Sequence, residues 1–176
     1  MRIRVSPSTL RGEVQAPPSK SVMQRLVAGA LLADGTSTLD NISQSDDCTA
    51  SLMLVSQLGA EIEIGEQRVS IVGTGGKLLP RTEVLTPGES GLAARLFTPI
   101  AGLAPTPLRM EAEGTLVQRP MAVYESLFDS YGGQLSCLNG AFPVEIARSL
   151  VGGAAELKVP ISSQYITGLL FALPNL

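Results

Sequence analysis

The sequence contains neither histidine nor tryptophan, and only two of its 176 residues, Cys48 and Cys137, are cysteines. The absence of histidine excludes a Ser-His-Asp triad and removes the side chain that most often joins cysteine at zinc sites. Two cysteines so far apart in the chain do not make a disulfide framework. We therefore expect a protein that holds no metal and needs no cofactor.

Charged residues are also few, at 16%, and 13 basic and 16 acidic side chains give a net charge of −3. Because no long block of either sign occurs, the sequence argues against a nucleic-acid partner, while leaving room for local basic clusters. The apolar run Leu26–Ala33 is far shorter than the roughly 20 residues of a membrane helix. Arg2 and Arg4 are followed by no apolar region, so the N-terminus is not a secretory signal. We expect a cytoplasmic protein with no membrane partner.

Hydrophobic residues make up 44% of the chain and the mean hydropathy is +0.25, which is typical of a globular domain. Helical and strand periodicities alternate along the whole length, which predicts an α/β (α+β) fold. Pro99 should kink its helix, Pro120 suits a first helical residue, and Pro143 should place its strand at a sheet edge or a bulge. The expected helices cover about 19–33, 45–58, 91–103, 120–131 and 162 onward, and the expected strands 36–42, 61–64, 68–72, 82–86, 108–113, 134–138, 141–147 and 156–159.

Three helix starts recur at a nearly constant spacing. They read Ser-Lys-Ser, Glu-Ser-Gly and Ser-Ser-Gln, and their central residues Lys20, Ser90 and Ser163 are 70 and 73 residues apart. The spacing indicates an internal repeat in which each copy is a βαβαββ unit. We expect repeat one over about 15–80, repeat two over about 81–150 and the start of repeat three over 151–176, with the three helix N-termini on one common face.

Small polar residues and cations gather at these helix starts. A helix N-terminus offers unpaired N–H groups and a partial positive charge, so it favours an anion. For a single serine, N-capping is the simpler interpretation, and Asp46 and Asp47 are interpreted as a helix cap. Gly91 either permits a local backbone conformation or lets a ligand approach the main chain closely. Four cations near the three starts favour a shared anion site: Lys20, Arg25, Arg95 and Arg119.

Four separated motifs carry a specific resemblance. PPSKSVMQR (17–25), GESGLAAR (88–95), QRPM (118–121) and SSQY (162–165) resemble, in order and spacing, the 5-enolpyruvylshikimate-3-phosphate synthase family, also called 3-phosphoshikimate 1-carboxyvinyltransferase. The resemblance covers the whole chain but only about the first two fifths of a typical member. It implies a transferase of the shikimate pathway to chorismate and the aromatic amino acids, the target of glyphosate. Such an enzyme joins phosphoenolpyruvate to the 5-hydroxyl of shikimate 3-phosphate and releases phosphate.

The resemblance also implies roles for individual residues. Glu89 and Leu92 depart from the asparagine and threonine usual in the second motif, and we expect Glu89 to pair with Arg95 or Arg119. Arg95 is expected to support the site without being a main contact. The residues matched to shikimate 3-phosphate are Lys20, Ser21, Arg25, Ser162, Ser163 and Gln164, and those matched to phosphoenolpyruvate are Lys20, Gly91, Arg119 and Gln164.

The family has two domains of three βαβαββ units each, which close over the substrates. The resemblance therefore implies that residues 1–176 are an incomplete N-terminal substrate-binding domain, and that the second domain, absent here, supplies the groups for proton transfer. We expect this chain to bind without turnover and the longer protein to be a monomer. Two alternatives are the UDP-N-acetylglucosamine enolpyruvyl transferase family, which starts with Lys-Asn where this chain has Lys20-Ser21 and has no Ser-Ser-Gln, and a non-catalytic domain of the same fold.

Overall fold

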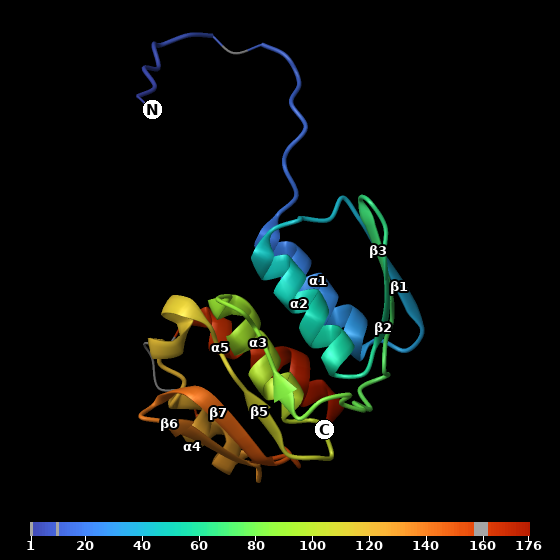
Figure 1. Ribbon diagram of the computed structural model, residues 1–176, viewed down its shortest axis with the longest axis vertical. Helices are drawn as coiled ribbons and strands as arrows, with labels where there is room; N and C mark the ends of the chain where they lie inside the picture. The colour runs from blue at the N-terminus through green and yellow to red at the C-terminus, as the bar shows by residue number, and fades with distance from the viewer. Residues whose placement is uncertain (1, 10, 157–161) are drawn as a thin grey trace.

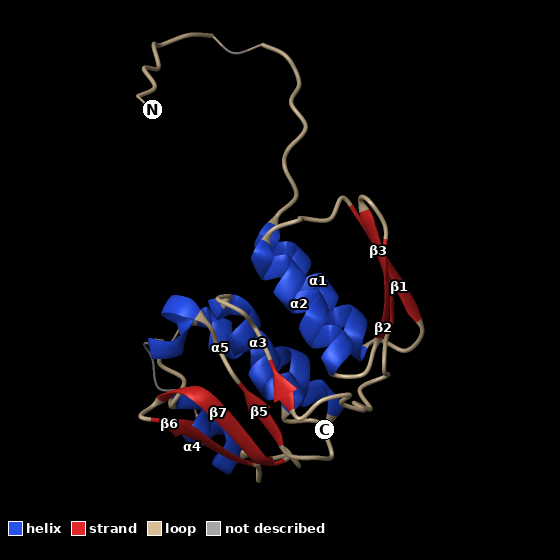
Figure 2. Ribbon diagram, in the orientation of Figure 1, coloured by secondary structure: helices blue, strands red, loops and turns tan. Residues whose placement is uncertain are grey.

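The computed structural model describes residues 2–9, 11–156 and 162–176. Residues 2–9 and 11–18 contain no helix or strand and extend away from the body of the chain (Figure 1). The body contains two sheets with helices packed on them and between them (Figure 2). The predicted α/β class is confirmed.

The first repeat folds into two helices and a three-stranded sheet. The sheet is antiparallel with the order β1-β3-β2, and the two helices lie together against one of its faces (Figure 1). The helices begin after Ser19 and Ser45, the small polar residues that the sequence indicates as caps. The elements are α1 (Lys20–Leu32), β1 (Thr36–Asp40), α2 (Asp46–Gln57), β2 (Glu61–Ile64) and β3 (Arg68–Val72).

The second repeat has the full βαβαββ order. Its sheet runs β4-β5-β7-β6, in which β4 and β5 are parallel and the other neighbours are antiparallel. A short 3-10 turn, η1 (Gly114–Gln118), precedes its second helix. The elements are β4 (Val84–Leu85), α3 (Gly91–Ala101), β5 (Leu108–Met110), α4 (Val123–Ser130), β6 (Gln134–Leu138) and β7 (Ala141–Arg148).

The third repeat contributes α5 (Ser163–Ala172), which begins after Ser162 and is followed by the turn η2 (Leu173–Asn175). Helices α3 and α5 pack on each other and lie between the α1–α2 pair and the second sheet (Figure 1). Apart from Glu156, the expected strand over 156–159 lies outside the described residues.

The glycine at the crossing of α3 and α5 lets the two helices approach closely. Gly168 lies on α5 against α3, and a Cβ atom there would lie 2.5 Å from the Arg95 carbonyl oxygen and 2.7 Å from Pro99 Cγ. Residues Ala93–Ala101 of α3 are all buried. This crossing is therefore fixed by backbone contact, and it places the starts of both helices side by side.

Three local predictions differ from the structure. Repeat one has no opening strand among its described residues: Pro17 and Pro18, which precede α1, have no N–H to donate to a sheet. Pro143 lies on β7, which is an interior strand, so the prediction that its strand lies at a sheet edge is wrong. The register shift beside Pro143 agrees with the alternative prediction of a β-bulge. The sequence predicts Phe97, Phe128 and Phe171 as core residues; Phe97 and Phe128 are buried in the core, whereas Phe171 is only partly buried.

The helix expected from Pro120 begins three residues later, at Val123. The N–H groups of Met121 and Ala122 both donate to the carbonyl oxygen of Gly140, at 2.9 and 3.2 Å. The turn between β6 and β7 therefore holds this segment outside the helix. As a result, Arg119 lies in the connection between η1 and α4 and not at a helix start.

Cys137 on β6 is half-buried, and burial together with the nearby Glu125 carboxylate raises the pKa of its thiol to about 12. The Glu125 carboxylate also accepts the Cys137 backbone N–H at 2.8 Å. Only the thiolate reacts with thiol reagents, so native Cys137 should react slowly at pH 9. In a Cys48→Ala background, Glu125→Gln should react several times faster, because the glutamine oxygen keeps the hydrogen bond but removes the charge. Glu63→Gln, at an exposed position on β2, is the control, and equal rates for all three proteins would contradict the prediction.

Candidate functional site

One cavity of about 560 Å³ lies where the first turns of α1, α2, α3 and α5 meet. The three helix starts predicted to share a face are therefore brought together. Three different repeats contribute to its wall. The lining residues are Lys20, Ser21, Gln24, Asp47, Gly91, Leu92, Arg95, Arg119, Ser162 and Gln164.

At the start of α1, Lys20 forms an ion pair with Asp47 on α2. The Lys20 Nζ to Asp47 Oδ2 distance is 2.6 Å. The hydrogen bond that Lys20 donates to Asp47, and then the negative charge of Asp47, raise the pKa of the Lys20 ammonium above its usual 10.5, so Lys20 stays protonated at neutral pH. The sequence indicated Asp47 only as a helix cap; its contact with Lys20 depends on how α1 and α2 pack.

Gln24, one turn further along α1, is fully buried and joins three helix starts. Its Nε2 donates to Ser90 Oγ at 2.8 Å and to the Asp47 carbonyl oxygen at 3.0 Å. Among the described residues, no group donates to its Oε1. Gln24 was not predicted as a site residue, although an amide on an otherwise apolar helix face between Met23 and Val27 was a usable signal.

At the start of α3, Ser90 Oγ caps the helix by accepting the Ala93 N–H at 3.2 Å. Arg95, which is 8% exposed, donates from Nη1 to Gln164 Oε1 at 3.0 Å and to the Gly91 carbonyl oxygen at 3.4 Å. Its guanidinium carbon also lies 5.2 Å from the centroid of the Tyr165 ring. Arg95 thus holds Gln164 of α5 against the start of α3.

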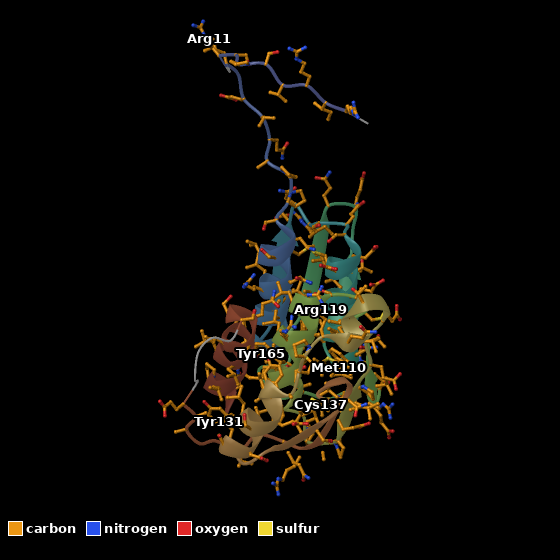
Figure 3. All side chains as sticks on the ribbon, turned by 90° about the vertical axis from the view of Figure 1, so that its left-hand side faces the viewer. Arg11, Met110, Arg119, Tyr131, Cys137 and Tyr165 are labelled. Atoms are coloured by element: carbon orange, nitrogen blue, oxygen red, sulfur yellow. The ribbon has the colours of Figure 1, made fainter. Side chains whose placement is uncertain are left out.

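Arg119 reaches the same cavity from the end of η1, and its N–H donates to the Leu116 carbonyl oxygen at 2.9 Å. Tyr165 on α5 donates from its hydroxyl to the carbonyl oxygen of the next residue, Pro120, at 2.5 Å. Figure 3 shows Arg119 and Tyr165 within the body of the chain, whereas Arg11 lies far out on the N-terminal extension. Arg119 is therefore positioned both by its own turn and by α5.

Three of the predicted residues do not line the cavity. Arg25 donates from Nη1 to the Ser21 carbonyl oxygen at 2.8 Å, and Ser163 is exposed in the first turn of α5. Glu89 Oε2 accepts the backbone N–H of Thr115 at 3.2 Å. The expected pairing of Glu89 with Arg95 or Arg119 is wrong, since within residues 2–9, 11–156 and 162–176 no ion pair joins them.

The charges of the cavity suit an anionic ligand. Lys20, Arg95 and Arg119 outnumber the one lining carboxylate, Asp47, and helix N-termini add partial positive charge. In the described part of the chain, no group of three or more potential metal ligands occurs, and no helix is long and apolar enough to span a membrane.

A larger groove of about 720 Å³ lies beside β4, β5 and β7, and it is a weaker candidate. Arg109, one of its cations, pairs with Glu111 at 2.8 Å and with Glu145 at 3.1 Å. No helix start lines it. The smaller cavity, with its cations and its helix N-termini, is therefore the candidate binding site.

Comparisons with known proteins show the family of the chain. Residues 5–176 match the family model described as EPSP synthase (3-phosphoshikimate 1-carboxyvinyltransferase). The 3-phosphoshikimate 1-carboxyvinyltransferase of Clostridium beijerinckii is 36% identical, with 99% of this chain and 41% of the relative covered. The enzyme of the same name from Methanobrevibacter smithii is also 36% identical, over 95% of this chain and 39% of the relative.

The structure of EPSP synthase from Acinetobacter baumannii superimposes with a TM-score of 0.83 at 26% identity, covering 92% of this chain and 38% of that one. The chain thus spans about two fifths of the length of the curated relatives it matches. The family model, the relatives and the solved structure all give the same family, and each match covers nearly the whole chain. This chain therefore belongs to the EPSP synthase family.

Proposed function

We propose that this chain is the shikimate 3-phosphate-binding part of a 3-phosphoshikimate 1-carboxyvinyltransferase. The observation that carries the proposal is the meeting of three repeat-related helix starts around one cavity that contains Lys20, Arg119 and Gln164. The family match and the names of the relatives support the reaction class. None of the relatives named above supports the alternative of UDP-N-acetylglucosamine enolpyruvyl transferase.

In this proposal, the phosphate of shikimate 3-phosphate lies at the start of α5. Ser162 is exposed at the N-cap, its Oγ accepts the Gln164 N–H at 3.3 Å, and the first N–H groups of α5 point toward the same end of the helix. Lys20 lies across the cavity and can move from Asp47 to a ligand oxygen. Arg25 and Ser163 lie just outside the lining, so a contact from either requires a change of side-chain rotamer.

Phosphoenolpyruvate would bind between the start of α3 and the end of η1. Gly91 lines the cavity without a side chain, so a ligand can approach its backbone, and a Cβ atom there would lie 3.2 Å from Arg95 Nη1. Arg119 supplies a guanidinium, which can hold a phosphate or carboxylate through two hydrogen bonds. Gln164, fixed by Arg95, lies between this region and the start of α5, so it can contact both ligands.

The proposed reaction forms a C–O bond between the 5-hydroxyl oxygen of shikimate 3-phosphate and the enol carbon of phosphoenolpyruvate. The bond from that carbon to the phosphate oxygen breaks, and in the net balance the proton of the hydroxyl group goes to the released phosphate. The residues of the cavity bind and orient the two anions and neutralise their charge. We propose that the groups that move the protons belong to the part of the longer protein beyond these residues, and that the longer protein acts as a cytoplasmic monomer.

The experiment is a titration of the 176-residue chain with shikimate 3-phosphate, followed by NMR, beside an assay for released phosphate. We expect saturable binding at millimolar or lower ligand and no turnover when phosphoenolpyruvate is added. Shikimate is the matched ligand control: it should bind at least about tenfold more weakly, because it lacks the charge-assisted hydrogen bonds of the phosphate. Arg109→Ala, in the larger groove, should leave binding unchanged. Equal binding of shikimate and its phosphate, or turnover by the chain alone, would contradict the proposal.

A further inference from the structure

The carboxylate of Glu89 lies outside the cavity but beside the turn that leads to it. Its Oε2 accepts the Thr115 N–H at 3.2 Å, at the start of η1. Gly114 adopts a positive φ of 52°, and a Cβ atom at that position would overlap the Glu89 carboxylate. The carboxylate therefore occupies space that only a glycine at 114 leaves open.

A second hydrogen bond joins the same two segments. The Glu113 N–H donates to the Gly88 carbonyl oxygen at 2.9 Å. Gly88 directly precedes Glu89, and Glu113 lies two residues before Thr115. The loop before α3 and the turn η1 are thus connected twice, although they are about 26 residues apart in the sequence, as the Glu89–Thr115 pair shows.

Both connected segments lead directly into the cavity. Gly91 follows Glu89 by two residues, and Arg119 closes the turn that Thr115 opens. Inside the turn, Leu116 is buried, and its Cδ1 lies 3.8 Å from the Cβ position of Gly91. The spacing between the backbone at Gly91 and the guanidinium of Arg119 therefore depends on how firmly the turn is held against the loop.

We propose that Glu89 is a positioning residue, which holds η1 against the start of α3 and so sets the distance between Gly91 and Arg119. The inference rests on the proposed function, in which these two residues hold phosphoenolpyruvate. Two properties of Glu89 act in opposite directions. Its oxygen positions the turn and favours binding, whereas its negative charge near an anion site disfavours binding.

Two substitutions separate these effects. Glu89→Ala removes the acceptor, so the exchange of the Thr115 amide hydrogen should accelerate about tenfold or more, and the Arg119 Nε–Hε resonance should shift or broaden without any ligand. Glu89→Gln keeps an oxygen acceptor and should restore both signals. Gly114→Ala, which displaces the carboxylate from the other side, should resemble Glu89→Ala. Glu61→Ala, at an exposed position on β2, is the control.

Binding of phosphoenolpyruvate to the same proteins is the second readout. Glu89→Ala should weaken it several-fold, and Glu89→Gln should bind as tightly as the wild type or more tightly. The ligand-free Arg119 resonance decides the positioning role: if it is the same in Glu89→Ala and in the wild type, the inference is overturned. Absence of phosphoenolpyruvate binding by the wild type, with the Arg119 signal still dependent on Glu89, would instead overturn the proposed function and leave the positioning role supported.

Discussion

Gly168→Ala should lower the free energy of unfolding by about 1–3 kcal/mol, although alanine is the better helix former. The added methyl group would lie 2.5 Å from the Arg95 carbonyl oxygen and 2.7 Å from Pro99 Cγ. Neither atom belongs to a flexible side chain, so α5 has to move away from α3. The movement would also weaken the contacts of Arg95 with Gln164 and Tyr165.

Gly29→Ala is the matched control, since Gly29 is also in a helix interior, on α1. A methyl group there meets only Phe171 Cε1 at 3.5 Å, which is an ordinary contact. This variant should be more stable than the wild type by about 0.5–1 kcal/mol, because alanine costs less backbone entropy. Urea unfolding followed by circular dichroism measures both. A Gly168→Ala protein as stable as the wild type would show that α3 and α5 are not in backbone contact.

Asp47→Asn should bind shikimate 3-phosphate about tenfold more tightly than the wild type. In the free protein, Asp47 holds Lys20 at 2.6 Å, so an incoming phosphate competes with a carboxylate for the ammonium group and is repelled by it. Asparagine removes the competitor and leaves the backbone oxygen that Gln24 contacts. The Lys20 pKa would fall back toward 10.5, but Lys20 stays charged at neutral pH.

Asp46→Asn provides the control for charge alone. Asp46 precedes Asp47 in the first turn of α2, is exposed and does not line the cavity. Its substitution changes the net charge equally and should alter the affinity little, because exposed charges are screened. Isothermal titration at two salt concentrations compares the three proteins. Equal gains in both variants, or weaker binding by Asp47→Asn, would mean that the ion pair does not compete with the ligand.

Local sequence signals were sufficient for the starts of α1, α3 and α5 and for the strands of the two hairpins. Ser19, Ser90 and Ser162 each accept a backbone N–H from their own first turn, so their effect is contained within a few residues. The hairpins of β2 with β3 and of β6 with β7 have turns with glycine at 65 and 140, and their ranges match closely. The prediction that the three helix starts lie on one common face was based on the repeat spacing alone.

The missed features depend on contacts between segments that are distant in the sequence. Nothing near Gln24 in the sequence indicates that Ser90 is its partner, and nothing near Asp47 indicates Lys20. Arg119 was expected at a helix start because Pro120 suits one, but the distant Gly140 carbonyl oxygen holds the following residues outside the helix. Such pairs depend on how distant segments pack together. The pattern of a single segment contains no information about this packing.

The hydrogen bonds that shape the cavity also determine when it can form during folding. Gln24 and Ser90 are 66 positions apart, Arg95 and Gln164 are 69 apart, and Pro120 and Tyr165 are 45 apart. Each closes a long loop, which is entropically costly, and formation of such contacts is slow compared with that of a helix or a hairpin. The cavity therefore assembles late, after the separate repeats have acquired their secondary structure. A ligand can bind the cavity only when the repeats are fully docked. By linkage, its binding therefore also stabilises the docking of the repeats.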